Sequence, residues 1–444
     1  MSQISEAKLG LVKGLVEQAP DGAIRNLLMA LSADGGHDAG LTRVQQLVEA
    51  EAADRRARNL AFSPIAPLCN IPGPFSGLSF PPRTLSQIWK ALKTDSPELM
   101  ADALALADDW RLDESSPEVF DALCRRTAAG LREAGGPFAA AAASADAGGG
   151  RETLAACLDI APVARRALDQ IPEWLGRMTS EKAAKLRLTY RDVVAIADDA
   201  GPRYFEMLAA HLTEPWLILR IISGVMDRPN ETYMSGSELA SFGERVLADI
   251  DRRLAEVAAF KSTSGRKAAH AVAQSAHLAC VEIAELDQSI NLSPEGVWGR
   301  RVARQKNSLA TTVEAHLRAA DPAVGLALPL QTQRLGPRVA KGFPKLTVDP
   351  DPIAVDKAAT LLIFMNEVRS SAAAGGFASS RAKAMEILEA RLDTYVEDIL
   401  GEIRSEHDET RERAKAFLEV AAELCGLLRD EKAAQIVRRR AAAA

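Results

Sequence analysis

Residues 116–131 read SPEVFDALCRRTAAGL and carry the pattern that decides the fold class. Ser116 is suited to cap the free amides of a helix. Pro117 stands in the first turn, where the backbone amide would make no hydrogen bond within the helix, and Glu118 is near the positive end of the helix dipole. Apolar residues then follow at helical spacing: Val119, Phe120, Leu123 and Leu131. The stretch predicts an amphipathic helix.

The same start signal occurs twice more, as Ser-Pro-Glu at 96–98 and at 293–295. Helical spacing of apolar residues recurs along the whole chain, and no run alternates β-branched residues in the way that a half-buried strand does. We therefore predict an all-α protein without a sheet, built as a multi-helix bundle or a short helical array.

Length and composition fit a globular protein. The chain has 444 residues, enough for two or three domains, and is 47% hydrophobic and 26% charged, which argues against global disorder. Aromatic residues make up only 5%, so the core must consist mainly of Ala, Leu, Val and Ile. The net charge of −6 predicts solubility and does not indicate a particular partner.

The cysteines argue against a disulfide framework or a structural zinc site, because their number is odd and no CxxC pair occurs. They are widely spaced, at Cys69, Cys124, Cys157, Cys280 and Cys425. Residues 1–15 mix charged with apolar side chains and predict neither a signal peptide nor a membrane span. We expect a cytoplasmic protein.

Two segments interrupt the helical pattern in the manner of connectors. Residues 134–150, AGGPFAAAAASADAGGG, contain eight Ala and five Gly, and this composition predicts a linker. It would separate an N-terminal helical domain, 1–145, from a C-terminal helical region, 151–444. A second connector is expected at 321–352, where six prolines occur.

The Pro-rich segment, residues 59–82, contains six prolines and three phenylalanines but no charged residue. Proline at this density excludes a long helix, and the apolar content argues against a solvated linker. Two interpretations stay open. The segment either buries its side chains as an arm strapped across the helical body, or it leaves part of them accessible to a partner. Phe62, Phe75 and Phe80 are the candidate partner-binding residues.

The C-terminal half aligns with itself at an offset of 145 residues, and three apolar stripes keep their phase. Trp216–Leu219 falls on Leu361–Phe364, and Cys280 falls on Cys425. Either 205–290 and 350–435 are duplicated three-helix units, or Ala-rich amphipathic helices coincide by chance.

The chain lacks the common catalytic signatures: a GxxxxGK phosphate loop, GxGxxG after a strand, HExxH and GxSxG. An acidic cluster at Asp108–Glu114 has residue types that can hold Mg²⁺ against a diphosphate, as in all-helical prenyl-transfer enzymes, with Asp198 and Asp199 as a second cluster. The alternative is a solvated acidic helix end.

One predicted helix carries His270, His277 and Cys280, at spacings that suit metal ligands. On a helical wheel Cys280 turns toward the Val272–Ile283 stripe instead, so we expect a small buried hydrophobe and no metal site. Residues 266–270 and the Ala-rich stretch after them resemble the phosphorylated helix of histidine phosphotransfer domains. That family has Lys and Gly three and four residues after the histidine, where this chain has Ala273 and Gln274. We therefore do not assign the chain to the histidine phosphotransfer family.

Basic residues are concentrated between 296 and 348, a range that contains nine Lys or Arg but only two acidic residues. Arg300, Arg301 and Arg304 are the candidate residues for meeting an acidic protein surface or a nucleic-acid backbone. The alternative is a solvated helix face followed by a connector.

These observations favour a noncatalytic interaction protein, a scaffold, adaptor or regulator that binds a protein partner without a cofactor. One alternative is a helical enzyme acting on a phosphorylated or isoprenoid-like substrate through Mg²⁺-binding carboxylates. The other is nucleic-acid binding through 296–348. Neither the identity of the partner nor the oligomeric state follows from the sequence.

Overall fold

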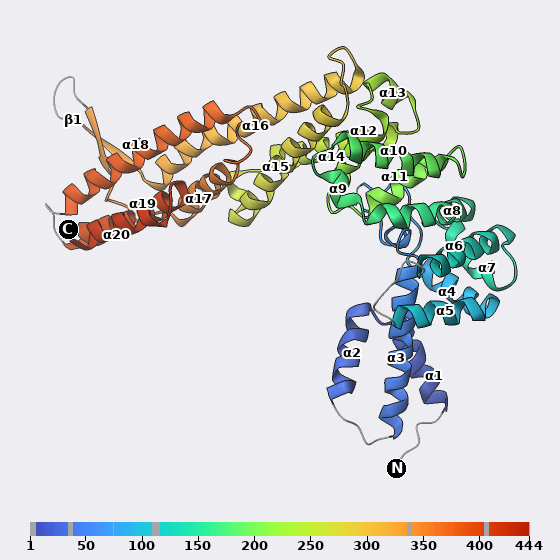
Figure 1. The fold of residues 1–444 in the computed structure, drawn as a ribbon. Helices are drawn as coiled ribbons and strands as arrows, with labels where there is room; N and C mark the ends of the chain where they lie inside the picture. The colour runs from blue at the N-terminus through green and yellow to red at the C-terminus, as the bar shows by residue number, and fades with distance from the viewer. Residues whose placement is uncertain are drawn as a thin grey trace. The chain divides into compact units, whose positions relative to one another are not determined.

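The computed structural model describes residues 6–33, 39–73, 75–108, 116–334, 340–403 and 408–443, and within them it is mostly helical and contains one β-hairpin (Figure 1). The prediction of an all-α fold is confirmed. The chain divides into two compact units, Met1–Asp227 and Arg228–Ala444. None of the described helices combines the length and apolar character that crossing a bilayer requires.

The first unit is assembled from short and medium helices. Its α-helices are α1 (Glu6–Gln18), α2 (Asp21–Ala33), α3 (Ala39–Ala61), α4 (Arg83–Asp95), α5 (Pro97–Asp108), α6 (Ser116–Glu133), α7 (Ala139–Asp146), α8 (Arg151–Leu168), α9 (Ile171–Leu175), α10 (Ser180–Val194), α11 (Ala200–Ala210) and α12 (Ile218–Met226). Three 3-10 helices join them: η1 (Ala66–Cys69), η2 (Gly136–Phe138) and η3 (Pro215–Leu217).

The Ser-Pro-Glu signals at 96–98 and 116–118 begin helices as predicted, since α5 starts at Pro97 and α6 at Ser116. α6 packs against α8, and the apolar stripe read from the sequence, including Phe120 and Leu123, is buried between them and their neighbours. α1, α2 and α3 lie side by side around a smaller apolar cluster that includes Val16, Ile24 and Val48 (Figure 1).

Residues 134–150 were expected to form a linker, but they are part of the first unit. η2 and α7 pack against α4, α6 and α8, and Phe138, Ala141 and Ala145 are buried. Alanine provides enough side chain to pack where helices approach closely, which the linker interpretation overlooked. The division into compact units falls at 227/228 instead of at 145/151.

Most helices of the second unit are long. Its helices are α13 (Glu231–Gly236), α14 (Ala240–Ala259), α15 (Arg266–Ser289), α16 (Val297–Ala327), α17 (Pro352–Glu367), α18 (Ala378–Ile403), α19 (Asp408–Leu428) and α20 (Glu431–Ala443), with the 3-10 helix η4 (Ser262–Ser264).

Alanine dominates the contact between α15 and α17. One face of α15 buries alanines at 269, 273, 276 and 279, and α17 buries Ala358 and Ala359 in the same core. Around this contact, α16 packs against α17 and α18, and α19 packs against α17, α18 and α20 (Figure 1). The aromatic-poor composition therefore leads to an alanine-rich core, as expected.

The third Ser-Pro-Glu signal does not begin a helix directly. Residues 293–295 form a turn, and α16 begins at Val297. Two of its first amides are capped by a distant residue: the Glu231 carboxylate accepts hydrogen bonds from the amides of Trp298 (2.8 Å) and Gly299 (3.2 Å). The same carboxylate accepts from the amide of Ser293 in the preceding turn (3.0 Å). A Cβ on Gly296 would lie 2.1 Å from this carboxylate, so a larger residue there would displace the cap.

The prediction of no sheet was wrong at one place. β1 (Leu330–Arg334) and β2 (Ala340–Pro344) pair antiparallel, with Leu330 opposite Pro344 and Thr332 opposite Gly342. These strands hold almost no β-branched residues, so side-chain pattern could not reveal them. The expected connector at 321–352 is thus partly ordered: α16 continues through Pro322, and the hairpin follows.

The duplication stays a prediction. At the offset of 145 residues, α12, α14 and α15 correspond in order to α17, α18 and α19. However, 205–290 spans the boundary between the two units. α12 packs against α9, α10 and α11 within the first unit, whereas α17 packs against α15, α16 and α19 within the second.

Candidate functional site

The predicted acidic cluster, residues 109–114 with the side chain of Asp108, lies outside the described residues. In the second proposed cluster, Asp199 forms an ion pair with Arg203, at 2.5 Å between the carboxylate and the guanidinium. The hydrogen bond from Arg203 lowers the pKa of Asp199, so this carboxylate already has a cationic partner.

The histidines and the cysteine of α15 do not converge. The His270 ring lies 3.2 Å from the Glu367 carboxylate, whereas the His277 ring lies 3.0 Å from the Ser371 hydroxyl. Cys280 is buried, as the sequence predicted, and burial raises the pKa of its thiol to about 11. Across the described ranges, no group of three or more His, Cys, Asp or Glu is placed to hold a metal ion.

The three candidate arginines of the basic segment differ in their surroundings. Arg301 is paired with Glu244 (2.8 Å) and Asp251 (2.6 Å), which neutralises its charge. Arg300 and Arg304 are exposed one turn apart on α16 and contact no acidic side chain in the described part of the chain. Their role in binding stays a prediction.

Most of the Pro-rich segment is buried in the first unit. Phe62, Ile65, Leu68 and Phe80 are at most 3% exposed. The Phe62 ring packs edge-on against Trp89, with centroids 6.4 Å apart, and the amide of Phe80 donates to the Leu68 carbonyl at 2.7 Å. Phe62 and Phe80, which the sequence proposed for partner binding, therefore serve as core.

One edge of the Pro-rich segment stays accessible. Ile71 is 86% exposed, and Phe75 and Leu78 are half-buried beside it. They border a hollow of about 260 Å³ whose other wall includes Leu212 and Pro215. We call this hollow the Ile71 groove. The Phe75 ring lies against Trp216, with centroids 6.1 Å apart, so one wall of the groove is anchored to the body of the unit.

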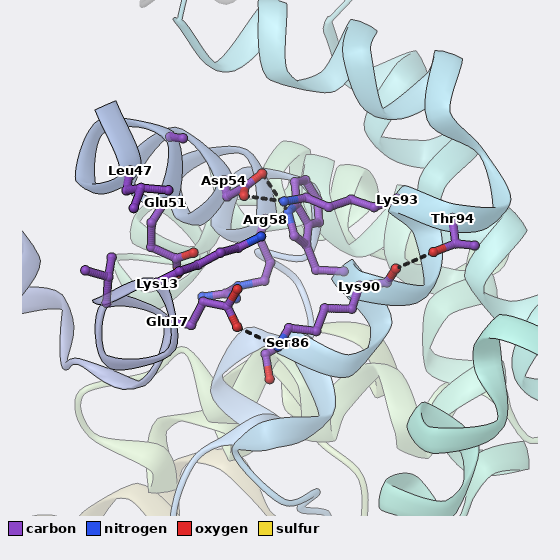
Figure 2. Close-up of a pocket in the computed structure, with 13 residues that line it drawn as sticks. Lys13, Glu17, Leu47, Glu51, Asp54, Arg58, Ser86, Lys90, Lys93 and Thr94 are labelled. Carbon is purple, nitrogen blue, oxygen red and sulfur yellow. Dashed lines mark hydrogen bonds and ion pairs between the residues drawn. The ribbon is translucent and has the colours of Figure 1, made fainter. Parts of the chain in front are cut away.

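A larger pocket of about 630 Å³ lies among three helices of the same unit (Figure 2). We call it the α1–α3–α4 pocket. α1, α3 and α4 each turn one face toward it, because residues three, four and seven apart share a helix face. The lining side chains include Lys13 and Glu17 from α1, Leu47, Glu51, Asp54 and Arg58 from α3, and Ser86, Trp89, Lys90 and Lys93 from α4.

Opposite charges on the pocket walls are paired with each other. Lys90 binds Glu17 at 2.8 Å, and this hydrogen bond lowers the pKa of the Glu17 carboxyl. Lys93 binds Asp54, which also accepts a hydrogen bond from the Trp89 indole at 3.2 Å. These contacts join α4 to α1 and α3.

A buried arginine, Arg55, holds one of the carboxylates that line the pocket. Arg55 binds Glu51 (2.7 Å) and Asp21 (2.6 Å). Its guanidinium also donates to the carbonyls of Val16 (3.1 Å) and Glu17 (3.3 Å), in the last turn of α1. The Arg55 side chain thus connects the end of α1 and the start of α2 to α3. It also engages the Glu51 carboxylate in an ion pair.

Two cations of the pocket have no such partner. Among the described residues, neither Lys13 nor Arg58 makes a hydrogen bond or an ion pair. Arg58 is half-buried, and burial lowers the pKa of its guanidinium. Figure 2 shows both side chains directed into the space between α1, α3 and α4. The pocket therefore presents two cations that are not engaged in an ion pair among the described residues.

Sequence reasoning missed the α1–α3–α4 pocket. Glu51, Asp54 and Arg58 are three and four residues apart on one face of α3, and this spacing was a readable signal. Their meeting with α1 and α4 was not, because those helices are far apart in sequence and carry no motif.

The comparisons with known proteins give no relative: no family model matches the chain, and neither a curated protein nor a solved structure does.

Proposed function

We propose that this chain is a noncatalytic helical interaction protein that binds a protein partner at the Ile71 groove. The exposure of Ile71 supports this proposal most directly. A large aliphatic side chain is 86% exposed in a segment whose other apolar residues are largely packed, and it borders a hollow whose walls combine apolar side chains with Asn70, Ser76 and Glu206. Clustered apolar side chains beside a concave surface are typical of protein interfaces.

The rigid part of the Pro-rich segment favours binding. Because Phe62, Leu68 and Phe80 fix the segment to the core, the groove is held in shape before a partner arrives. A preorganised surface loses little conformational entropy on binding.

The test is Ile71→Asp in the full chain, with affinity purification from the native host followed by reconstitution with the purified partner. We expect the variant to fold with wild-type stability, because the side chain is exposed, and to bind its partner about tenfold more weakly or worse. A charged side chain at the groove would have to lose its hydration in the complex.

Ile353→Asp is the matched control. Ile353 is also an isoleucine and is 65% exposed, but it lies on α17 in the second unit. It should retain the partner. If Ile71→Asp binds as well as the wild type does, the groove is not the binding surface.

We also propose a cytoplasmic location. All five cysteines are free and buried, which suits a reducing compartment.

A further inference from the structure

We propose that the α1–α3–α4 pocket is a binding site for a small organic anion, a carboxylate or a phosphate ester with an apolar body, and that Arg58 and Lys13 hold its charged group. This site is separate from the Ile71 groove and does not depend on the proposed partner.

Arg58 is the first reason. A half-buried guanidinium without a hydrogen-bonding partner is unfavourable, because burial removes part of its hydration and no protein acceptor replaces it. Arg58 nevertheless lies in the pocket with no acceptor within reach among the described residues. An arginine in this setting is suited to a ligand that brings its own acceptors, since its planar fork matches carboxylate and phosphate oxygens.

The pairing of the other charges is the second reason. The carboxylates of Glu17, Asp54 and Glu51 are engaged by Lys90, Lys93 and Arg55. The excess positive charge is therefore concentrated at Lys13 and Arg58. An anion there would meet two unpaired cations, whereas a cation would find every nearby carboxylate already bound.

The size and walls of the pocket indicate the rest of the ligand. A volume of about 630 Å³ lies in the range of small-molecule sites and far exceeds what one inorganic anion needs. Val16, Leu47 and Ala50 line it beside the polar groups. The ligand should therefore combine an anionic head with an apolar or aromatic body.

Calorimetric titration of the full chain tests this with four probes: phenyl phosphate, phenylacetate, inorganic phosphate and benzyl alcohol. We expect saturable one-to-one binding of phenyl phosphate or phenylacetate, and the tighter of the two identifies the head group. The aromatic anion should bind about fivefold or more tightly than inorganic phosphate, because of the apolar walls. Uncharged benzyl alcohol should not bind. If neither aromatic anion binds saturably up to about 5 mM, the proposal is wrong.

Arg58→Met assigns the site. We expect it to weaken binding of the aromatic anion about tenfold or more, because charge-assisted hydrogen bonds are lost. Without ligand its melting temperature should equal or exceed that of the wild type, since an unpaired half-buried charge is removed. A merely structural arginine would instead lower the melting temperature. Unchanged affinity in Arg58→Met would overturn the assignment.

Two further variants complete the test. Arg43→Met changes an exposed arginine of the same helix that does not line the pocket, and it should leave binding unchanged. Lys13→Met should weaken binding about threefold or more, as expected for an exposed cation near the ligand. If Arg58→Met does not fold, Lys13→Met decides: wild-type affinity in that variant would contradict the proposal.

Discussion

Glu282 is fully buried on α15, which packs against α14, and we expect it to make the stability of the second unit depend on pH. Burial raises the pKa of its carboxyl to about 8, although Arg253 donates to it at 2.8 Å and opposes this change. The nearby Asp249 carboxylate adds to the increase. The folded protein therefore keeps a proton between pH 4.5 and about 8 that the unfolded chain has released.

The sign of the effect follows from linkage. Because the folded state binds more protons in this window, its free energy of unfolding should fall as pH rises from about 5 to 8, by up to roughly 1.4 kcal/mol per pH unit. Glu282→Gln mimics the protonated acid and should flatten the profile in urea titrations at pH 5.5, 7 and 8.5. Glu412→Gln is the control, because the hydrogen bond from Lys415 lowers the pKa of that exposed carboxyl below the window. A wild-type slope in Glu282→Gln would show that this residue is not responsible.

At the scale of elements, the contact between α6 and η2 gives a sharp test of the packing at 134–150. A Cβ added to Gly130 would lie 2.4 Å from the Phe138 ring, which is buried. Gly130→Ala should therefore destabilise the first unit by about 1–3 kcal/mol despite the better helix propensity of alanine. Gly10→Ala, in the interior of α1 with open space around it, should be neutral or stabilising by about 0.5–1 kcal/mol. Chemical denaturation compares them, and equal stabilities would mean that Phe138 is not held in place.

Helices were predictable from the sequence because caps and apolar spacing are local, and α5 and α6 begin where Ser-Pro-Glu predicts. The features that the sequence did not predict depend on contacts between residues far apart in the chain. The cap of α16 comes from Glu231, more than sixty residues away, and the β1–β2 hairpin depends on backbone hydrogen bonds instead of side-chain pattern. For the same reason the sequence identified the Pro-rich segment as important but could not tell buried Phe80 from exposed Ile71.

At the scale of the whole molecule, a boundary at 227/228 predicts different stable fragments than a boundary near residue 150 does. α8 begins at Arg151 and packs against α6 and α7, with Leu154 and Leu158 fully buried. A fragment 151–444 would lack those partners and expose apolar surface worth about 1.5–3 kcal/mol for each such side chain. A fragment 228–444 would keep its own core and the Glu231 cap of α16.

We therefore expect 228–444 to unfold cooperatively and to show a helical circular dichroism spectrum, whereas 151–444 should aggregate or bind a hydrophobic dye. The fragment 1–227 should fold on its own, because its core contacts lie within it. The proposed repeat unit 205–290 crosses the boundary between the two compact units, so we expect a fragment of that range to stay unfolded. If 205–290 and 350–435 were instead duplicated, independently folding units, each fragment would be stable alone. A soluble, cooperative 151–444 beside an unfolded 228–444 would place the boundary near residue 150 after all.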